Sequence, residues 1–269
     1  MRRSAEICFH GKKEILNEIY AKISMYSEKI NITADMLTVE IYEDTQGYVL
    51  LMDELTKRDI KYTFAEGREY TKEELKAAKF FSMEIIYPWE SDGTTAEKFG
   101  TRYENTCQRC GIGKKQISDL IIDTKKAVKY DISTIQPEII VNERLYNLIN
   151  ENGLTGCSFK TIKDFRERND IVLYQLIVTS ILPPMNEAIR VETVDGFKCE
   201  ECKRNGEILR SEAIYEGGSL QKASDFNLTY EYFGLNLYCS RHVIVSSKVY
   251  NIFNKNKIKR VAFEPVRII

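Results

Sequence analysis

Residues 139–162 read IIVNERLYNLINENGLTGCSFKTI, and residues 243–266 read VIVSSKVYNIFNKNKIKRVAFEPV. The two segments align without a gap, 104 positions apart. Identical pairs occur at polar as well as apolar positions, and they include Val141/Val245, Tyr146/Tyr250, Asn147/Asn251, Asn150/Asn254, Asn152/Asn256 and Phe159/Phe263. Chance similarity between two amphipathic segments does not account for matched asparagines, so we expect an internal duplication.

Each aligned segment has the pattern of a strand, a short helix and a second strand. An apolar β-branched triplet leads to a polar residue suited to cap a helix, Asn142 in the first segment and Ser246 in the second. An amphipathic stretch follows, Asn152-Gly153 fits a left-handed helix end, and alternating residues predict a returning strand. Such a unit cannot bury both of its sides alone. We therefore expect the two copies to share a sheet or to pack on each other.

The composition fits a folded protein of one or two domains, with 269 residues of which 43% are hydrophobic. The 39 basic and 40 acidic residues nearly cancel, whereas proteins that bind phosphate backbones usually carry a basic excess. The longest apolar run, residues 171–185, is interrupted by polar residues and prolines and is too short to span a membrane. The N-terminus lacks the apolar core of a signal peptide. We expect a cytoplasmic protein with reduced cysteines and no membrane segment.

The first third of the chain alternates strand and helix signals and predicts an α/β module over residues 1–95. Asp44 is expected to cap one helix, and Thr71 with Glu74 forms the capping box of another. The polar, glycine-containing stretch 91–106 marks the boundary to a second domain. Apolar residues at helical spacing run from Ile15 to Tyr26, and strand patterns occur at residues 6–9, 36–42, 60–64 and 83–89.

Residues 96–269 read mostly as β-structure, with the two aligned segments as the helical exceptions. The fold class is therefore α+β: an N-terminal α/β module, followed by a sheet-rich domain with two duplicated strand–helix–strand units. A hairpin is expected from residues 117–122 and 127–130, and further strands at residues 171–182, 207–215 and 227–233.

Two CxxC pairs are the strongest chemical signal in the sequence. Cys107 and Cys110 form the first, in CQRCG, and Cys199 and Cys202 form the second, in CEEC. A CxxC turn points both sulfurs at one spot, and two such turns supply the four thiolates of a tetrahedral zinc site. We therefore predict that these four cysteines bind one Zn²⁺ shared between the two copies. Four protein ligands leave no open position, so the zinc is expected to be structural.

Two features depart from the usual zinc knuckle. Lys203 stands where a glycine is expected after the second pair, whereas Gly111 follows the first, and 88 residues separate the pairs. A disulfide, a thioredoxin-type redox pair and unligated buried thiols are the alternatives to zinc. Cys157 aligns with a valine and is read as a core residue. Cys239 and His242 are read as a buried thiol and a strand-edge histidine, and a metal role for them stays open.

No catalytic constellation is recognisable in the sequence. The two histidines, His10 and His242, lie in no nucleophile–base motif. The stretch GIGKK at 111–115 lacks the spacing of a phosphate-binding P-loop. We therefore expect a non-catalytic protein, and a metal-stapled enzyme is the weaker alternative.

The arrangement resembles bacterial double-CxxCG motif proteins and the related immunity proteins of polymorphic toxin systems. The resemblance rests on CQRCG at 107–111, CEEC at 199–202, TKEELKAAKFF at 71–81 and the segment that begins at Ile139, and it covers mainly residues 70–269. It implies a sheet-rich body with a zinc knuckle and a protein that acts by binding another protein. We accordingly expect an immunity or inhibitor-type factor that covers the site of a toxin or defence effector.

A nucleic-acid-binding zinc ribbon is the alternative function. The balanced charge and the acidic pair Glu200-Glu201 inside one knuckle argue against it, and salt-dependent binding to DNA or RNA would favour it. Its basis is a possible basic strip with aromatic residues that stack on bases, made of Lys114-Lys115, Lys125-Lys126, Arg166, Arg168 and the run Lys255, Lys257, Lys259 and Arg260.

Overall fold

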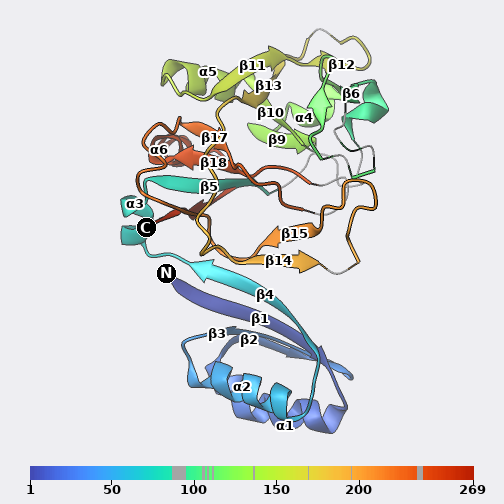
Figure 1. Ribbon diagram of the computed structural model, residues 1–269, viewed down its shortest axis with the longest axis vertical. Helices are drawn as coiled ribbons and strands as arrows, with labels where there is room; N and C mark the ends of the chain where they lie inside the picture. Colours follow the sequence, from blue (N-terminus) through green and yellow to red (C-terminus); the bar gives the residue numbers. More distant parts are fainter. Residues whose placement is uncertain are drawn as a thin grey trace. The chain divides into compact units, whose positions relative to one another are not determined.

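The structure, a computed structural model, describes residues 1–86, 95–104, 107, 109–110, 112–135, 137–168, 170–194, 196–234 and 239–269. It divides into two compact units, Met1–Ala77 and Ala78–Ile269, whose elements are labelled in Figure 1. The division falls before the boundary expected between residues 95 and 96. The reason is that the strand Phe80–Ile85 pairs with strands from the end of the chain and so belongs to the second unit. Of the expected linker at 91–106, residues 91–94, 105 and 106 lie outside the described residues, and residues 96–99 and 103–104 form η2 and β6.

The first unit is an antiparallel sheet in the order β2-β3-β1-β4 with two helices on one face (Figure 1). This interleaving of two split βαβ units is the ferredoxin-like arrangement. Alternate residues of β1, namely Ala5, Ile7 and Phe9, are buried against Leu16 and Leu51 of the helices. The elements are β1 Arg2–His10, α1 Lys13–Ile23, η1 Ser24–Tyr26, β2 Ser27–Ile32, β3 Met36–Tyr42, α2 Gln46–Lys57, β4 Tyr62–Glu69 and α3 Lys72–Ala77.

Helix starts in the first unit test the predicted caps. The capping box is confirmed, since the Thr71 N–H donates to the Glu74 carboxylate at 2.8 Å and the Glu74 N–H donates to the Thr71 hydroxyl at 3.1 Å. The cap of α2 was expected one residue too early. Thr45, not Asp44, accepts a hydrogen bond from the first turn, because the Asp44 carboxylate pairs with the Arg2 guanidinium at 3.1 Å.

The second unit is richer in strands than the first. In the described parts of the chain, no helix is long and apolar enough to cross a membrane. Its elements are β5 Phe80–Ile85, η2 Ala96–Phe99, β6 Tyr103–Glu104, β7 Lys115–Gln116, β8 Ile121–Ile122, α4 Thr124–Ala127, β9 Ile132–Ile135, β10 Glu138–Asn142, α5 Glu143–Glu151, β11 Cys157–Thr161, β12 Lys163–Asp164, β13 Leu173–Val178, β14 Val191–Val194, β15 Gly206–Leu209, β16 Ile214–Tyr215, β17 Phe226–Leu228, β18 Val243–Ser246, α6 Ser247–Lys255, β19 Val261–Pro265 and β20 Arg267–Ile268.

The hairpin expected at residues 117–122 and 127–130 is wrong. Ile121–Ile122 is a strand, but it pairs in parallel with β12, and Thr124–Ala127 is the short helix α4. The helix begins there because the Asp164 carboxylate accepts a hydrogen bond from the Thr124 N–H at 3.0 Å. That partner lies 40 residues away in sequence, so local propensity does not reveal it.

Two antiparallel four-stranded sheets dominate the second unit, and their strand orders correspond: β9-β10-β13-β11 and β17-β18-β5-β19. In each sheet a strand–helix–strand segment supplies the second and fourth strands, and a strand from elsewhere in the chain lies between them. The registers also agree, since Leu176 pairs with Ile139 and Phe159, and Met83 pairs with Val243 and Phe263.

In each four-stranded sheet, the strand that lies between the two strands of the strand–helix–strand segment comes from the other half of the unit. β5 precedes the first CxxC pair, yet it lies between β18 and β19 near the end of the chain. β13 precedes the second CxxC pair and lies between β10 and β11. We define the first half as residues 78–170 and the second half as residues 171–269. Neither half holds a complete four-stranded sheet by itself.

An aromatic cluster of similar geometry packs each helix on its sheet. Tyr146 of α5 stacks on Tyr174 of β13 with ring centroids 3.9 Å apart, and Phe159 of β11 meets Tyr146 edge-on at 4.9 Å. In the other sheet Tyr250 stacks on Phe81 at 4.1 Å, and Phe263 meets Tyr250 edge-on at 5.3 Å. Aromatic pairs in such geometries add to the burial of their surface. The identical tyrosines of the aligned segments therefore occupy matching packing positions.

The helix caps of the two segments also match. The side chains of Asn142 and Ser246 each accept a hydrogen bond from the first helical turn, as predicted. Each cap is held in turn by a carboxylate, Asp131 at 3.1 Å from the Asn142 amide and Asp225 at 2.6 Å from the Ser246 hydroxyl. These bonds fix where both helices begin.

We predict that Gly156→Ala destabilises the second unit far more than Gly153→Ala. Both glycines have positive φ, 81° and 56°. A Cβ at Gly156 would lie 2.1 Å from the carbonyl oxygen of Phe226, whereas at Gly153 nothing lies within 4 Å. Strain at φ costs about 1–2 kcal/mol at either position, and the clash adds about 1–3 kcal/mol at Gly156. Urea denaturation followed by circular dichroism measures the difference, and equal losses would contradict the packing described at Gly156.

Candidate metal centre

Each CxxC pair lies in the connection of a two-stranded hairpin. β6 pairs with β7 around Cys107 and Cys110, and β14 pairs with β15 around Cys199 and Cys202. The hairpins hold the two turns as short, closed loops. The turns then meet, which brings together the four cysteines predicted from the sequence as ligands.

The four sulfur atoms have the spacing of a tetrahedral thiolate site. All four lie within 4.8 Å of one another, with 3.6 Å between Cys107 Sγ and Cys199 Sγ and 3.6 Å between Cys110 Sγ and Cys202 Sγ. Four sulfurs placed about 2.3 Å from a central ion form a tetrahedron with edges of about 3.8 Å. A disulfide needs sulfurs about 2.05 Å apart, and the cysteines are free thiols. The donor set therefore fits a metal ion better than a disulfide.

Contacts between corresponding residues join the two knuckles. The first cysteine of one pair meets the first of the other, and the second meets the second. The Arg109 guanidinium pairs with Glu200 at 2.6 Å, and the Arg109 N–H donates to Glu201 at 3.1 Å. The Arg109–Glu200 pair is exposed and adds little stability by itself. Three of the four cysteines are buried and Cys202 is exposed, so the centre lies close beneath the surface.

Lys203 replaces the glycine that a second knuckle usually carries. It adopts the left-handed conformation itself, with φ 62°, and its N–H donates to the Cys199 carbonyl at 2.9 Å to close the turn. The lysine ammonium donates to the Glu200 carbonyl at 2.5 Å. A side chain in this conformation costs about 1 kcal/mol, which the knuckle tolerates. Gly111, expected to play this part in the first knuckle, lies outside the described residues.

The thiols of the cluster differ in acidity. The backbone N–H groups of Cys202 and Glu201 donate to the Cys199 sulfur and lower the pKa of that thiol to about 7. Burial raises the pKa of the Cys110 thiol to about 12. Because metals bind thiolates, binding must release protons from the cluster. Metal affinity should therefore rise with pH.

The remaining cysteines and His242 lie outside this cluster. Cys157 and Cys239 are half-buried free thiols, and burial raises the pKa of both. Burial lowers the pKa of the His242 imidazole, whose ring lies 4.9 Å from that of Phe233. Within the described ranges, Cys107, Cys110, Cys199 and Cys202 are the one group of three or more ligating side chains close enough to share a metal.

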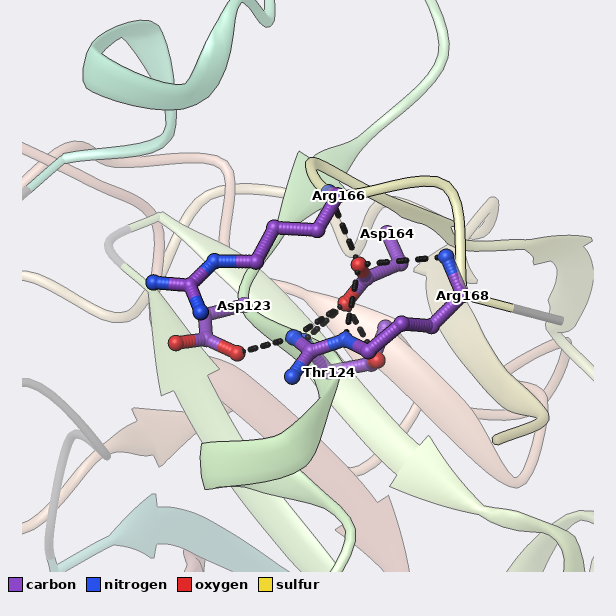
Figure 2. A network of polar contacts seen from close by, with 5 residues as sticks. All are labelled: Asp123, Thr124, Asp164, Arg166 and Arg168. Atoms are coloured by element: carbon purple, nitrogen blue, oxygen red, sulfur yellow. Dashed lines mark hydrogen bonds and ion pairs between the residues drawn. The ribbon is translucent and has the colours of Figure 1, made fainter. Parts of the chain in front are cut away.

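A second cluster of charged side chains joins α4 to the turn after β12 (Figure 2). The side chain of Asp164 is fully buried, and its carboxylate accepts hydrogen bonds from the Thr124 hydroxyl at 2.6 Å and the Arg168 guanidinium at 2.7 Å. Arg168 also pairs with Asp123. Burial alone would raise the pKa of Asp164, but the bonds from Arg168 and Thr124 outweigh it and hold that pKa well below its usual range. The network is a structural clamp, so Arg168 is engaged inside the fold and is not a free member of the basic strip expected from the sequence.

The four cysteines have the spacing of a closed thiolate site, a class in which a metal holds a fold together. No model of a known protein family matches the chain, and no curated protein matches it either. The resemblance to double-CxxCG motif proteins therefore stays a hypothesis carried by the motifs.

We predict one bound divalent metal ion per chain in protein purified without chelator. Cys199→Ser should abolish binding and lower stability by more than about 3 kcal/mol, because structural metal sites contribute binding free energy to folding. Cys157→Ser is the matched control, since that thiol is also partly buried but lies outside the cluster. Elemental analysis and thermal melting measure both effects. Full metal content in Cys199→Ser would contradict the assignment.

We also predict that Asp164→Asn destabilises the second unit by about 3 kcal/mol, because it leaves Arg168 without its buried partner. The pKa of Asp164 is depressed in the folded state, so its stabilisation is complete above the unfolded pKa of about 4 and is lost as pH falls further. Arg166→Ala is the control, since Arg166 reaches Asp164 through its backbone N–H. Urea titrations between pH 7 and pH 3 should show the stability difference between wild type and Asp164→Asn begin to narrow below about pH 4. The difference between wild type and Arg166→Ala should stay constant over the same range.

Proposed function

We propose that this protein is a non-catalytic protein-binding factor of the immunity or inhibitor type, which neutralises a toxin or defence effector. The observation that carries the proposal is the cluster of four cysteines, which as thiolates would occupy every tetrahedral position around a metal. Such a centre leaves no place for a substrate or an activated water, so its metal supports a shape. The resemblance of CQRCG and CEEC to double-CxxCG motif and immunity proteins supplies the class of partner.

We propose that the metal is Zn²⁺, bound by Cys107, Cys110, Cys199 and Cys202. Soft thiolate ligands in a tetrahedral set favour zinc among the common divalent ions. The site requires reduced thiols, which the cytoplasm maintains. We accordingly place the protein in the cytoplasm, where the metal would be loaded as the chain folds.

We further propose that the second unit arose by duplication of one segment. Supporting this, the pair β8–β12 corresponds to β16–β20, since both are parallel and join residues at matching positions. Contacts between the halves are also reciprocal. The Arg144 guanidinium donates to the Asn256 carbonyl at 2.7 Å, and the Lys248 ammonium donates to the Gly153 carbonyl at 3.4 Å. Arg144 and Lys248 are aligned residues of the two segments.

On this proposal, function follows from rigidity. Each half completes its sheet with a strand of the other, and the metal joins the knuckles of both. A preformed surface loses little conformational freedom when it binds, which raises affinity for a partner. An inhibitor that must cover an enzyme's site benefits from such a platform.

Protein binding has better support than nucleic-acid binding, because cations of the supposed basic strip are engaged inside the protein. Lys114 pairs with Glu97 and lies 4.0 Å from the centroid of the Tyr103 ring. Arg168 belongs to the Asp164 clamp, and Arg260 lies 3.8 Å from the centroid of the Tyr130 ring. Cations held in this way contribute less to a track for phosphates.

We predict that the zinc-loaded protein forms a stoichiometric complex with the product of a gene adjacent to its own, and that the complex suppresses the toxicity of that product. Chelation of the zinc should abolish the complex, because the platform loosens. Size-exclusion chromatography and a growth-rescue assay measure the two effects. If folded, metal-loaded protein binds none of the neighbouring products yet binds DNA or RNA at low salt, the nucleic-acid alternative replaces the proposal.

A further inference from the structure

An open, shallow groove of about 570 Å³ lies on the first half of the second unit. Side chains around β7, β8, β11 and β12 line it, and they include Arg102, Ile117, Asp119, Lys160 and Lys163. None of these belongs to the metal centre, to the Asp164 clamp or to the basic strip considered from the sequence.

The groove carries an excess of positive charge, with three cations against one carboxylate. The Lys163 ammonium pairs with Asp119 at 2.8 Å. The bond from Lys163, together with the nearby charge of Lys160, lowers the pKa of Asp119. In the part of the chain that the structure describes, Arg102 and Lys160 form no ion pair. Two exposed cations thus remain available to a ligand.

The second half of the unit shows that the fold does not require this charge. Lys160 of β11 pairs with β13, and Glu264 of β19 pairs with β5 at the matching position of the other sheet. Lys163 likewise corresponds to Arg267 in the parallel strand pairs, and Arg267 lies 3.7 Å from the buried carboxylate of Glu212. The same backbone therefore carries an acid in place of Lys160, whereas the Arg267–Glu212 pair corresponds to the Lys163–Asp119 pair. The positive charge at Lys160 is not repeated at the matching position of the second half.

The walls of the groove are held by hydrogen bonds between neighbouring segments. The Arg102 N–H donates to the Ser118 hydroxyl at 2.8 Å, and the Ile121 N–H donates to the Thr101 hydroxyl at 2.9 Å. The Ile117 N–H donates to the Arg102 carbonyl at 3.0 Å. These bonds place Arg102 and Ile117 before any ligand arrives, which reduces the ordering cost of binding.

The lining favours an acidic protein segment over a nucleic acid. Ile117 is 52% exposed and offers an apolar contact between the cations. No aromatic ring is among the lining residues to stack on a base. We propose that the groove binds an acidic segment of the partner protein, with carboxylates at Arg102 and Lys160 and an apolar side chain on Ile117. This inference rests on the proposed protein-binding function and names the surface and the chemistry of its partner.

The test uses the full-length, metal-loaded protein and the double variant Arg102→Glu/Lys160→Glu. The probe is a fluorescein-labelled, glutamate-rich peptide that contains leucine, with fluorescence polarisation as the readout at low salt. Reversal of these two exposed charges should weaken peptide binding by at least about tenfold, because the new glutamates would repel the carboxylates of the peptide. The control Lys125→Glu/Lys222→Glu makes the same change in net charge at exposed lysines outside the groove and should bind as the wild type does.

Three outcomes would overturn the groove assignment: unchanged peptide binding in the groove variant, equal losses in both double variants, or tighter groove-dependent binding of a single-stranded oligonucleotide. The neighbouring gene product provides the separate arm. If it binds wild type and groove variant alike, the groove assignment fails while the protein-binding function stands. If no neighbouring product binds but the peptide binds in a groove-dependent manner, the groove assignment stands and the inhibitor function fails.

Discussion

The exchange of middle strands between the two sheets is the constraint on which the second unit depends. β5 and β13 each lie between two strands supplied by the other half of the unit, and each carries the ring on which a helix tyrosine stacks. Removal of β5 would leave β19 without a partner strand, and removal of β13 would leave β11 without one. In each case the helix tyrosine would also lose the ring on which it stacks. Because sheets of this kind gain stability through such non-local pairs, neither half can fold to this structure without the other.

The cysteine cluster acts on the same pair of halves at a different point. Its sulfurs come from two hairpins separated by about ninety residues of chain, and corresponding cysteines meet across the centre. A metal here links segments that the exchanged strands already bring close, so binding requires little rearrangement.

Features set by local sequence were predictable, and features set by distant partners were not. The caps at Asn142 and Ser246 and the box at Thr71 depend on residues within one helical turn. The four cysteines were recognised because CxxC spacing has a direct geometric meaning. The strand exchange and the helix α4 escaped prediction, since the first depends on pairing across half the unit and the second on Asp164, a carboxylate forty residues away.

The two four-stranded sheets of the second unit agree in strand order and register, whereas side chains at matching positions differ: Lys160 on one sheet corresponds to Glu264 on the other. X-ray absorption spectroscopy at the zinc edge tests the central claim most directly. The account predicts a shell of four sulfur atoms at about 2.3 Å and no oxygen or nitrogen ligand. A mixed shell, or a zinc ion bound by only one of the two knuckles, would contradict it.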